Sequence, residues 1–387
     1  MNAEPAFPES AAAGFDGACG GLHSAARMND FEAARLTVRL GAVASNFREF
    51  QRMAGAATVA GVVKADAYGM GMVPVAKQLA AIGCDTFFVA RLQEGIALRP
   101  AVPRARIFVL DGAPREAVPA LIAYRLTPVL NSLADVENWS GAARDAAIHF
   151  DTGMSRLGLP AEELTVLVSE RARRLAGINV VLAMSHLACA DDPRASMNRV
   201  QLDRFRAALA TLPPAPASLS SSGGAMLGRD YAFDMIRPGV GLYGGNPQPN
   251  GPNPLSTVAV LTGRILQLRS IVPGETVGYG ATYVASRPTM LATAGLGYTD
   301  GLMRALSNRG SGAIGGVRAP IAGRVSMDLV TLDVTDVPQS SLRIGADVEF
   351  IGDSISLEEI AVASNTASYE ILTSLARRVP RHYEALG

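Results

Sequence analysis

The chain has 387 residues, of which 49% are hydrophobic and 18% are charged. This length and balance are typical of a folded protein with a large buried core and two domains, and they exclude an intrinsically disordered chain. The 35 basic and 35 acidic residues cancel, so no excess charge indicates nucleic acid or an anionic membrane as a partner. The cysteines Cys19, Cys84 and Cys189 lack metal-type spacing, which is the usage expected in a reducing cytosol.

Residues 1–30 differ in composition from the rest of the chain, since Ala, Gly and Ser dominate them. A signal peptide needs an apolar run of about 7–15 residues, and a membrane span needs about 20. Here Glu4, Glu9 and Asp16 interrupt the segment. We therefore expect a disordered N-terminal extension, or a native start near Met28, on a cytoplasmic protein without a membrane span.

Residues 31–255 alternate short β-rich runs with longer helical patterns. Eight runs have strand character: Thr58–Val63, Thr86–Ala90, Arg106–Leu110, Thr127–Leu130, Ala146–Phe150, Ile178–Met184, Ala217–Ser220 and Asp234–Ile236. Helical patterns lie between them, such as Ser196–Leu209 and Val73–Ile82, which ends at Gly83. Eight strands, each followed by a helix or loop, predict an α/β fold with a TIM-type (β/α)8 barrel rather than an open sheet.

Residues 256–387 change in character, because the apolar runs become short and β-branched and are separated by Gly and Pro. The expected strands are Thr257–Leu268, Met290–Leu296, Arg318–Val325, Leu329–Val334 and Val348–Ile351. One late helix is expected over Tyr369–Arg378. The glycine-rich Gly310–Gly316 lacks the lysine of a phosphate-binding P-loop, and we interpret it as a β-turn region. The sequence thus predicts a mostly β C-terminal domain.

The ends of the predicted barrel strands carry the chemistry. Active sites of such barrels lie at the carboxyl ends of the strands, often with a phosphate site after the last two. The strand ends in chain order are Lys64, Asp151-Thr152-Gly153, His186, Ser222-Gly223-Gly224 and Arg237-Pro238-Gly239. One lysine, one imidazole, one arginine and two small-residue loops suit an anionic cofactor joined to an amine, because burial lowers the pKa of a lysine and prepares it as a nucleophile.

The segment Val62-Val63-Lys64-Ala65-Asp66-Ala67-Tyr68-Gly69 resembles the pyridoxal-phosphate attachment motif of the alanine racemase family. Five further segments resemble the other blocks of the family, in the same order: Asp151–Gly158, Ile236–Gly239, Gly278–Gly280, Gly323–Asp328 and Arg378–Arg381. The resemblance spans residues 36–383. It implies an isomerase that interconverts L-alanine and D-alanine with pyridoxal 5'-phosphate, as a homodimer whose active sites are shared between subunits.

The resemblance also assigns the catalytic roles. Lys64 would bind the cofactor covalently and act as one of two bases, and Tyr279 of the partner subunit would be the other. Racemisation needs two, because one removes the α-proton and the other reprotonates the opposite face. Arg237 would hydrogen-bond the pyridine nitrogen of the cofactor. Since a guanidinium keeps its protons, that nitrogen should stay unprotonated, which limits transamination and decarboxylation.

The resemblance implies further contacts. The phosphate would be bound by Tyr68, Ser222, Tyr369 and the backbone of Gly239 and Val240. His186 would pack near the cofactor ring, and Arg156 would contact the phenolic oxygen of the cofactor. Arg156 and the Met327 backbone would bind the substrate carboxylate. The access route to the site would be lined by Asp191, Tyr298, Arg304 and Arg324. No metal is implied, since the Asp191-Asp192 pair has no histidine at ligand spacing.

Three positions depart from the family pattern. Many members have a carbamylated lysine seven residues before the counterpart of Arg156, where this chain has His149. Imidazole cannot carry a carbamate, so either another group or ion orients Arg156 or the imidazole does so itself. Ser326 stands in place of a commoner cysteine, and Ser221 in place of a commoner asparagine.

Several alternatives stay open at this point. Lys64 alone would be an ordinary surface lysine, His186 a core histidine, and Tyr279 and Tyr369 core or interface aromatics; Arg156 and Arg237 would be salt-bridge partners. The chain could instead racemise serine or lysine, or decarboxylate, which Arg237 disfavours. It could also bind pyridoxal phosphate without catalysis, which the C-terminal domain with Tyr279 and Met327 disfavours. Supply of D-alanine for peptidoglycan precursors and D-alanine catabolism are both compatible with the sequence.

Overall fold

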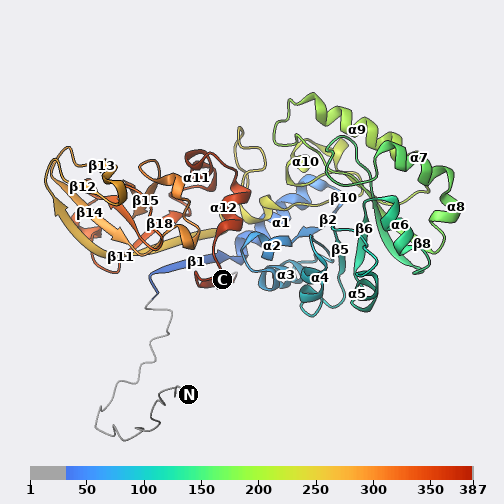
Figure 1. The fold of residues 1–387 in the computed structure, drawn as a ribbon, viewed down its shortest axis with the longest axis horizontal. Coiled ribbons are helices and arrows are strands. Elements are labelled where there is room, and N and C mark those ends of the chain that lie inside the picture. The colour runs from blue at the N-terminus through green and yellow to red at the C-terminus, as the bar shows by residue number, and fades with distance from the viewer. Residues whose placement is uncertain (1–31, 386–387) are drawn as a thin grey trace, which may run out of the picture. The chain divides into compact units, whose positions relative to one another are not determined.

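A computed structural model describes residues 32–385, so the predicted extension over residues 1–30 lies outside the described residues. From Ala33 onward the chain is one compact unit that contains a barrel and a mostly β region (Figure 1). This architecture confirms the predicted fold class. Among the described residues, no helix has both the length and the apolar character needed to cross a bilayer.

The barrel is a closed ring of parallel strands. Its strands are β2 (Thr58–Val59), β3 (Gly61–Val62), β4 (Thr86–Val89), β5 (Arg106–Val109), β6 (Thr127–Leu130), β7 (Arg144–His149), β8 (Ile178–Met184), β9 (Ala217–Ser218) and β10 (Met235–Ile236). The first barrel strand is interrupted, and β2 and β3 are its two parts. Strands β3 to β9 pair in sequence order, and β10 pairs in parallel with β2. The Asp234 N–H donates to the Ala217 carbonyl (3.0 Å), which joins β10 to β9 and closes the ring.

The helices of the barrel region follow the strands. They are α1 (Leu40–Ala54), α2 (Lys64–Tyr68), α3 (Met72–Ala81), α4 (Leu92–Leu98), α5 (Val118–Ala123), α6 (Leu133–Trp139), α7 (Ala161–Ser169), α8 (Arg171–Arg174), α9 (Ser196–Leu209) and α10 (Ser222–Met226). The expected ends of α9 are confirmed, whereas α3 begins and ends one residue before the expected Val73–Ile82. Gly83 has the positive φ (+96°) that favours glycine after a helix. Gln201 is buried on the inner face of α9, where its side-chain amide donates to the His186 carbonyl (2.9 Å). The neighbouring Val200 lies on the exposed face of the same helix.

The mostly β region contains β1 (Ala34–Arg39), β11 (Ala259–Ile271), β12 (Thr276–Val277), β13 (Tyr283–Val284), β14 (Thr289–Ala294), β15 (Ser311–Ile314), β16 (Val317–Pro320), β17 (Val330–Asp333), β18 (Asp347–Ile351) and β19 (Arg381–Glu384). Two helices, α11 (Leu357–Ser364) and α12 (Ser368–Ser374), belong to the same part of the chain. The sheet has the order β16-β15-β18-β11-β1-β19, and β14 pairs with both β11 and β17. Residues alternate between buried and half-buried along the first half of β11, as expected of a strand with one covered face.

Strand β1 is one of several elements that the sequence did not predict; the others include β12, β13, β15, β19 and α11. It precedes the barrel in the chain, yet it pairs antiparallel with β11 and parallel with β19. Backbone hydrogen bonds therefore join residues 34–39 to strands more than 200 residues later in the sequence. The domain boundaries at residues 30 and 255 stay a prediction.

Two elements of the C-terminal region end several residues earlier than predicted. The expected strand Arg318–Val325 ends as β16 at Pro320, which lacks the N–H needed to continue a ladder. The expected helix Tyr369–Arg378 ends as α12 at Ser374, because the Arg381 guanidinium donates to three carbonyls just beyond it, those of Leu375, Ala376 and Val379 (2.9–3.1 Å). The predicted turn over Gly310–Gly316 is confirmed only at Gly315 and Gly316, which have positive φ and join β15 to β16. Ser311–Ile314 form strand β15 instead, because their backbone pairs with β16.

Candidate active site

A cavity of about 660 Å³ opens at the carboxyl ends of the barrel strands. Its lining includes nine of the residues that the sequence singled out: Lys64, Tyr68, Arg156, His186, Ser222, Arg237, Gly239, Val240 and Tyr369. Tyr369 reaches the cavity from α12, which contacts α2. Most of the predicted site residues therefore meet in one place, at the end of the barrel where active sites lie.

Lys64 begins a left-handed turn. The next four residues, Ala65 to Tyr68, all have φ between +53° and +55°. For L-residues this conformation costs about 1–2 kcal/mol each, so it persists only where the surroundings impose it. The Glu94 carboxylate accepts the Ala65 N–H (2.7 Å), and the Asp66 carboxylate accepts the Met72 N–H (2.8 Å). These bonds hold the turn that carries Lys64 into the cavity.

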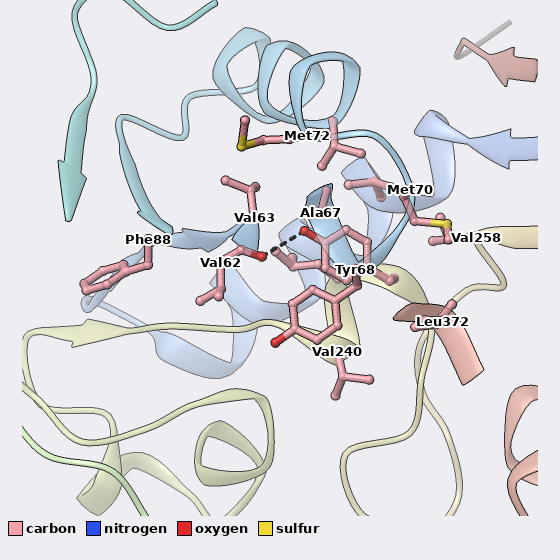
Figure 2. Packing of buried hydrophobic residues seen from close by; sticks show 14 of the residues in the cluster. Val62, Val63, Ala67, Tyr68, Met70, Met72, Phe88, Val240, Val258 and Leu372 are labelled. Carbon is pink, nitrogen blue, oxygen red and sulfur yellow. Dashed lines mark hydrogen bonds between the residues drawn. The ribbon is translucent and has the colours of Figure 1, made fainter. Parts of the chain in front are cut away.

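The far end of this turn is also clamped. Gly69 has φ +82°, and a Cβ there would lie 2.6 Å from the Leu372 carbonyl oxygen of α12, so only glycine allows this close approach. The Arg381 guanidinium donates to the Gly69 carbonyl (2.9 Å). Figure 2 shows Ala67, Tyr68 and Leu372 in the buried packing around the turn. The block Arg378–Arg381 thus helps to position the lysine.

The amine of Lys64 is in an environment that favours its neutral form. Burial lowers its pKa, and the positive charges of Arg156 and Arg237 act in the same direction, while Glu94 and Asp111 oppose them. A larger share of neutral amine makes Lys64 a better nucleophile and a better base near neutral pH.

Arg237 is a buried cation at the base of the cavity. One of its terminal nitrogens donates to the Ser218 hydroxyl, and the other donates to the Ser185 carbonyl (2.7 Å). Burial lowers its pKa to about 9, so it remains protonated at neutral pH. No carboxylate of residues 32–385 forms an ion pair with it. A buried positive charge without a counter-ion favours an electron-rich ligand.

His186 lies next to Arg237. Its Nδ1 is 3.4 Å from an Arg237 terminal nitrogen. Burial, and then the charge of Arg237, hold the pKa of His186 well below its usual range. The ring is therefore neutral, and its Nδ1 can accept a hydrogen bond from the guanidinium.

A cradle of hydroxyl and backbone groups lies on one wall of the cavity. The Ser222 hydroxyl accepts the N–H groups of Gly239 (2.8 Å) and Gly241 (3.2 Å). A Cβ at Gly239 would lie 2.3 Å from the Tyr68 hydroxyl oxygen, so the glycine lets that hydroxyl approach the backbone. The Tyr68 ring stacks on Tyr243 (4.9 Å) and lies beside Val240 (Figure 2). Burial raises the pKa of Tyr68, which therefore keeps its proton as a donor.

Together the cradle, the Lys64 amine and the two guanidinium groups of Arg156 and Arg237 fit a phosphorylated cofactor. Hydroxyl and amide donors suit the phosphate, and the amine suits a covalent bond to a carbonyl carbon.

Arg156 lies on the loop after β7. The Asp151 carboxylate shapes this loop by accepting the N–H groups of Gly153, Met154 and Ser155 (2.9–3.1 Å). Arg156 lines the cavity, but no hydrogen bond or ion pair joins its side chain to another of the described residues. Its guanidinium is available to an anionic ligand.

The remaining predicted residues do not line this cavity. Tyr279, Tyr298 and Met327 are 71%, 40% and 53% exposed. With the exposed Arg304 and Arg324 they form a group on neighbouring loops, which we call the Tyr279 surface. Its loops are joined by the Tyr298 N–H, which donates to the Ser326 carbonyl (3.0 Å).

The Tyr279 surface is held by ion pairs of its own. Arg378 donates to the carboxylates of Asp300 (2.7 Å) and Asp328 (2.6 Å). Asp300 lies on the same short helix as Tyr298, and Asp328 directly follows Met327 in the chain. Asp191 is exposed as well, and it lies near the cavity, since its charge adds to burial in raising the pKa of Tyr369.

Sequence reasoning assigned no role to several residues that support the site. Ser185 and Ser218 anchor Arg237, Glu94 anchors the Lys64 turn, and Asn131 hydrogen-bonds His149. A signal was present for two of them, because Ser185 and Asn131 directly follow predicted strands.

Comparison with known proteins gives consistent matches. The family model of the alanine racemase N-terminal domain matches residues 38–247, and that of the alanine racemase C-terminal domain matches residues 258–383. The chain is 46% identical over 358 residues to the catabolic alanine racemase of Agrobacterium fabrum, covering 91% of this chain and 92% of that relative. It is 44% identical over 362 residues to the alanine racemase of Rhodospirillum rubrum, covering 92% and 96%.

Solved structures agree. Alanine racemase from Bartonella henselae, crystallised with covalently bound pyridoxal phosphate, superposes with a TM-score of 0.87 at 37% identity, covering 91% of this chain and all of that chain. The biosynthetic alanine racemase from Pseudomonas aeruginosa has a TM-score of 0.86 at 33% identity, covering 91% and 99%.

Proposed function

This chain belongs to the alanine racemase family, and on that premise we propose that it interconverts L-alanine and D-alanine with Lys64 and the partner subunit's Tyr279 as the two bases. The enzyme class and the cofactor, pyridoxal 5'-phosphate, follow from the family. The residue roles and the shared site are the proposal.

The cavity residues would hold the cofactor. Lys64 would bind it covalently, and Arg237 would face its ring nitrogen. Its phosphate would be bound by Tyr68, Ser222, Gly239, Val240 and Tyr369. When bound, this cofactor withdraws electrons from the substrate α-carbon and so acidifies the α-proton. The fit rests on the buried uncompensated charge of Arg237 and on the hydroxyl and backbone cradle.

The protein would supply orientation and proton transfer. Arg156, which has no partner among the described residues, and the Met327 backbone would bind the substrate carboxylate. Lys64, whose pKa burial lowers, would move the proton on one face. Tyr279 would move it on the other face, and the two would exchange roles with the direction of reaction. Asp191, Tyr298, Arg304 and Arg324 would line the access route.

The observation that carries the shared site is the exposure of Tyr279. It is 71% exposed and is not among the residues that line the cavity of its own chain. A second copy can present it there: in a symmetric dimer the same contact occurs twice, so each cavity receives one Tyr279 surface. Peptidoglycan precursor supply stays a prediction of the resemblance, and a cytoplasmic location stays a prediction of the amino-acid composition.

Subunit complementation tests the proposal. In Tyr279→Phe the inversion rate should fall by about 100-fold or more, the scale of general acid–base catalysis, because only one face is served. Lys64 should still exchange the α-proton of one enantiomer with solvent deuterium. Lys64→Ala should be inactive alone. Mixed with Tyr279→Phe under subunit exchange, it should regain activity, because each heterodimer contains one intact site.

The recovered activity should be measured on heterodimers whose composition has been verified by mass spectrometry. No recovery in these would place Lys64 and Tyr279 at the same site of one subunit, or Tyr279 outside catalysis. A wild-type protein that leaves alanine unchanged but racemises serine or lysine would assign the cavity to another amino acid.

A further inference from the structure

A buried hydrogen bond links two barrel strands at the floor of the cavity. His149 ends β7, and Asn131 directly follows β6; both are less than 10% exposed. The Nδ1 atom of His149 lies 2.8 Å from the Asn131 side-chain oxygen. The Asn131 amide nitrogen donates to the carbonyls of Leu110 (2.9 Å) and Val129 (3.0 Å). Reversing the amide would break both bonds, so its oxygen faces the imidazole, and Nδ1 carries the hydrogen.

The imidazole is therefore neutral with its lone pair at Nε2. Burial, and then the charge of Arg237, lowers the pKa of His149 to about 4; Asp151 opposes this shift and Arg156 adds to it. With Nδ1 protonated, Nε2 is an acceptor at neutral pH. None of the described residues donates to Nε2, and His149 lines the cavity.

Three basic side chains share this cavity with His149. Arg237 donates to Ser218 and Ser185, and Lys64 is the cofactor attachment point under the proposed function. Arg156 has five N–H donors and no acceptor among the described residues.

We propose that His149 is a positioning residue for racemisation: its Nε2 accepts a hydrogen bond from Arg156 when that guanidinium binds the substrate, a bond that the ligand-free chain does not contain. Asn131 selects the tautomer that makes this bond possible. The inference rests on the proposed function, in which Arg156 binds the substrate carboxylate. A neutral acceptor orients the guanidinium without offsetting its charge, so the full positive charge faces the substrate.

The first test compares two replacements of His149. His149→Phe removes the acceptor, and the KM for alanine should rise by about 10- to 100-fold, the range of one hydrogen bond to a charged group. The visible absorbance of bound cofactor should be unchanged. His149→Gln places an amide oxygen near the position of Nε2 and should recover most of the KM. In an Arg156→Ala background, His149→Phe should add little, because the partner is already absent.

The second test uses pH. In Asn131→Asp a carboxylate beside Nδ1 favours the charged imidazole and raises its pKa. As pH falls through that raised pKa, Nε2 becomes a donor and repels Arg156, so the KM should rise at acid pH. The wild-type KM should be flat over the same range, since His149 titrates only near pH 4. Asn138→Asp is the matched control, because the Asn138 amide donates only to the Ala113 carbonyl and faces no imidazole.

A third measurement needs neither activity nor cofactor. Nitrogen NMR of the histidine-labelled apoprotein, with the His149→Gln variant to assign the signal, should show Nε2 without a hydrogen at neutral pH. A hydrogen on Nε2, or additive effects of His149→Phe and Arg156→Ala, would overturn the role of His149. A wild-type protein without racemase activity would overturn the proposed function instead, and the NMR result would still report the tautomer.

Discussion

The barrel cavity and the Tyr279 surface differ in how their residues are held. In the cavity, Glu94 holds the turn after Lys64, Ser185 accepts a hydrogen bond from Arg237, and Ser222 accepts the Gly239 N–H. On the Tyr279 surface the side chains are exposed, and Arg378 holds only the loops beneath them. Under the proposed function, the two regions have separate roles: the cavity of one chain would hold the cofactor, and the second base would come from the partner subunit.

This division separates two functions that a single-chain site would combine. Cofactor binding should depend on the cavity alone, and stereochemical inversion should depend on both regions. The following changes are ordered by the size of the effect expected from them.

Lys64→Ala gives the largest effect, because it removes the covalent attachment and one base together. Racemisation should fall by about 10,000-fold or more, and the visible absorbance of the bound cofactor should be lost. Exchange of the α-proton with solvent deuterium should also disappear, whereas Tyr279→Phe should retain it. A Lys64→Ala enzyme that still exchanges this proton would erase the distinction between the two regions.

Gly239→Ala should weaken cofactor binding without touching the Tyr279 surface. The new methyl group would lie 2.3 Å from the buried Tyr68 hydroxyl, which is held by stacking on Tyr243. Overpacking of this kind costs about 1–3 kcal/mol, so the Kd for pyridoxal phosphate should rise by about 10- to 100-fold in titrations of the apoprotein. Gly251→Ala is the control, since its methyl group would meet only the Gln248 carbonyl at 3.6 Å. Equal affinities for the two variants would mean that Tyr68 moves aside freely.

Ala65→Gly should have the smallest effect on racemisation. Unlike the other changes, it should increase the free energy of unfolding. Ala65 is exposed and has φ +53°, so glycine relieves strain without losing buried contacts. The apoprotein should gain up to about 1 kcal/mol in denaturant unfolding, while racemisation falls because the Lys64 turn is looser. Ala207→Gly, at an exposed position of α9, should lose about 0.5–1 kcal/mol. A loss in both variants would show that the turn stores no strain.

Much of the barrel was predictable because its signals are local. Each of the eight predicted barrel strands, from Thr58–Val63 to Asp234–Ile236, is a short apolar run in the sequence. The structure has a strand at each of these eight places. The residues that follow these runs converge because parallel strands in a closed barrel end at the same rim. Prediction failed where a partner lies far away in sequence: nothing local in Ala34–Arg39 shows that it pairs with β11 and β19.

By itself, then, the sequence determined the alternation of strands and helices, the family, and the order in which lysine, imidazole, arginine and glycine loops meet at the rim. These depend on hydrophobic periodicity and on the few residue types that each backbone position allows. Only the tertiary structure decided that the Lys64 turn is left-handed, that the Asn131 side-chain oxygen lies beside Nδ1 of His149, and that Tyr279 is exposed and does not line the cavity of its own chain. Those outcomes depend on contacts between distant segments, whose free energies no local pattern encodes.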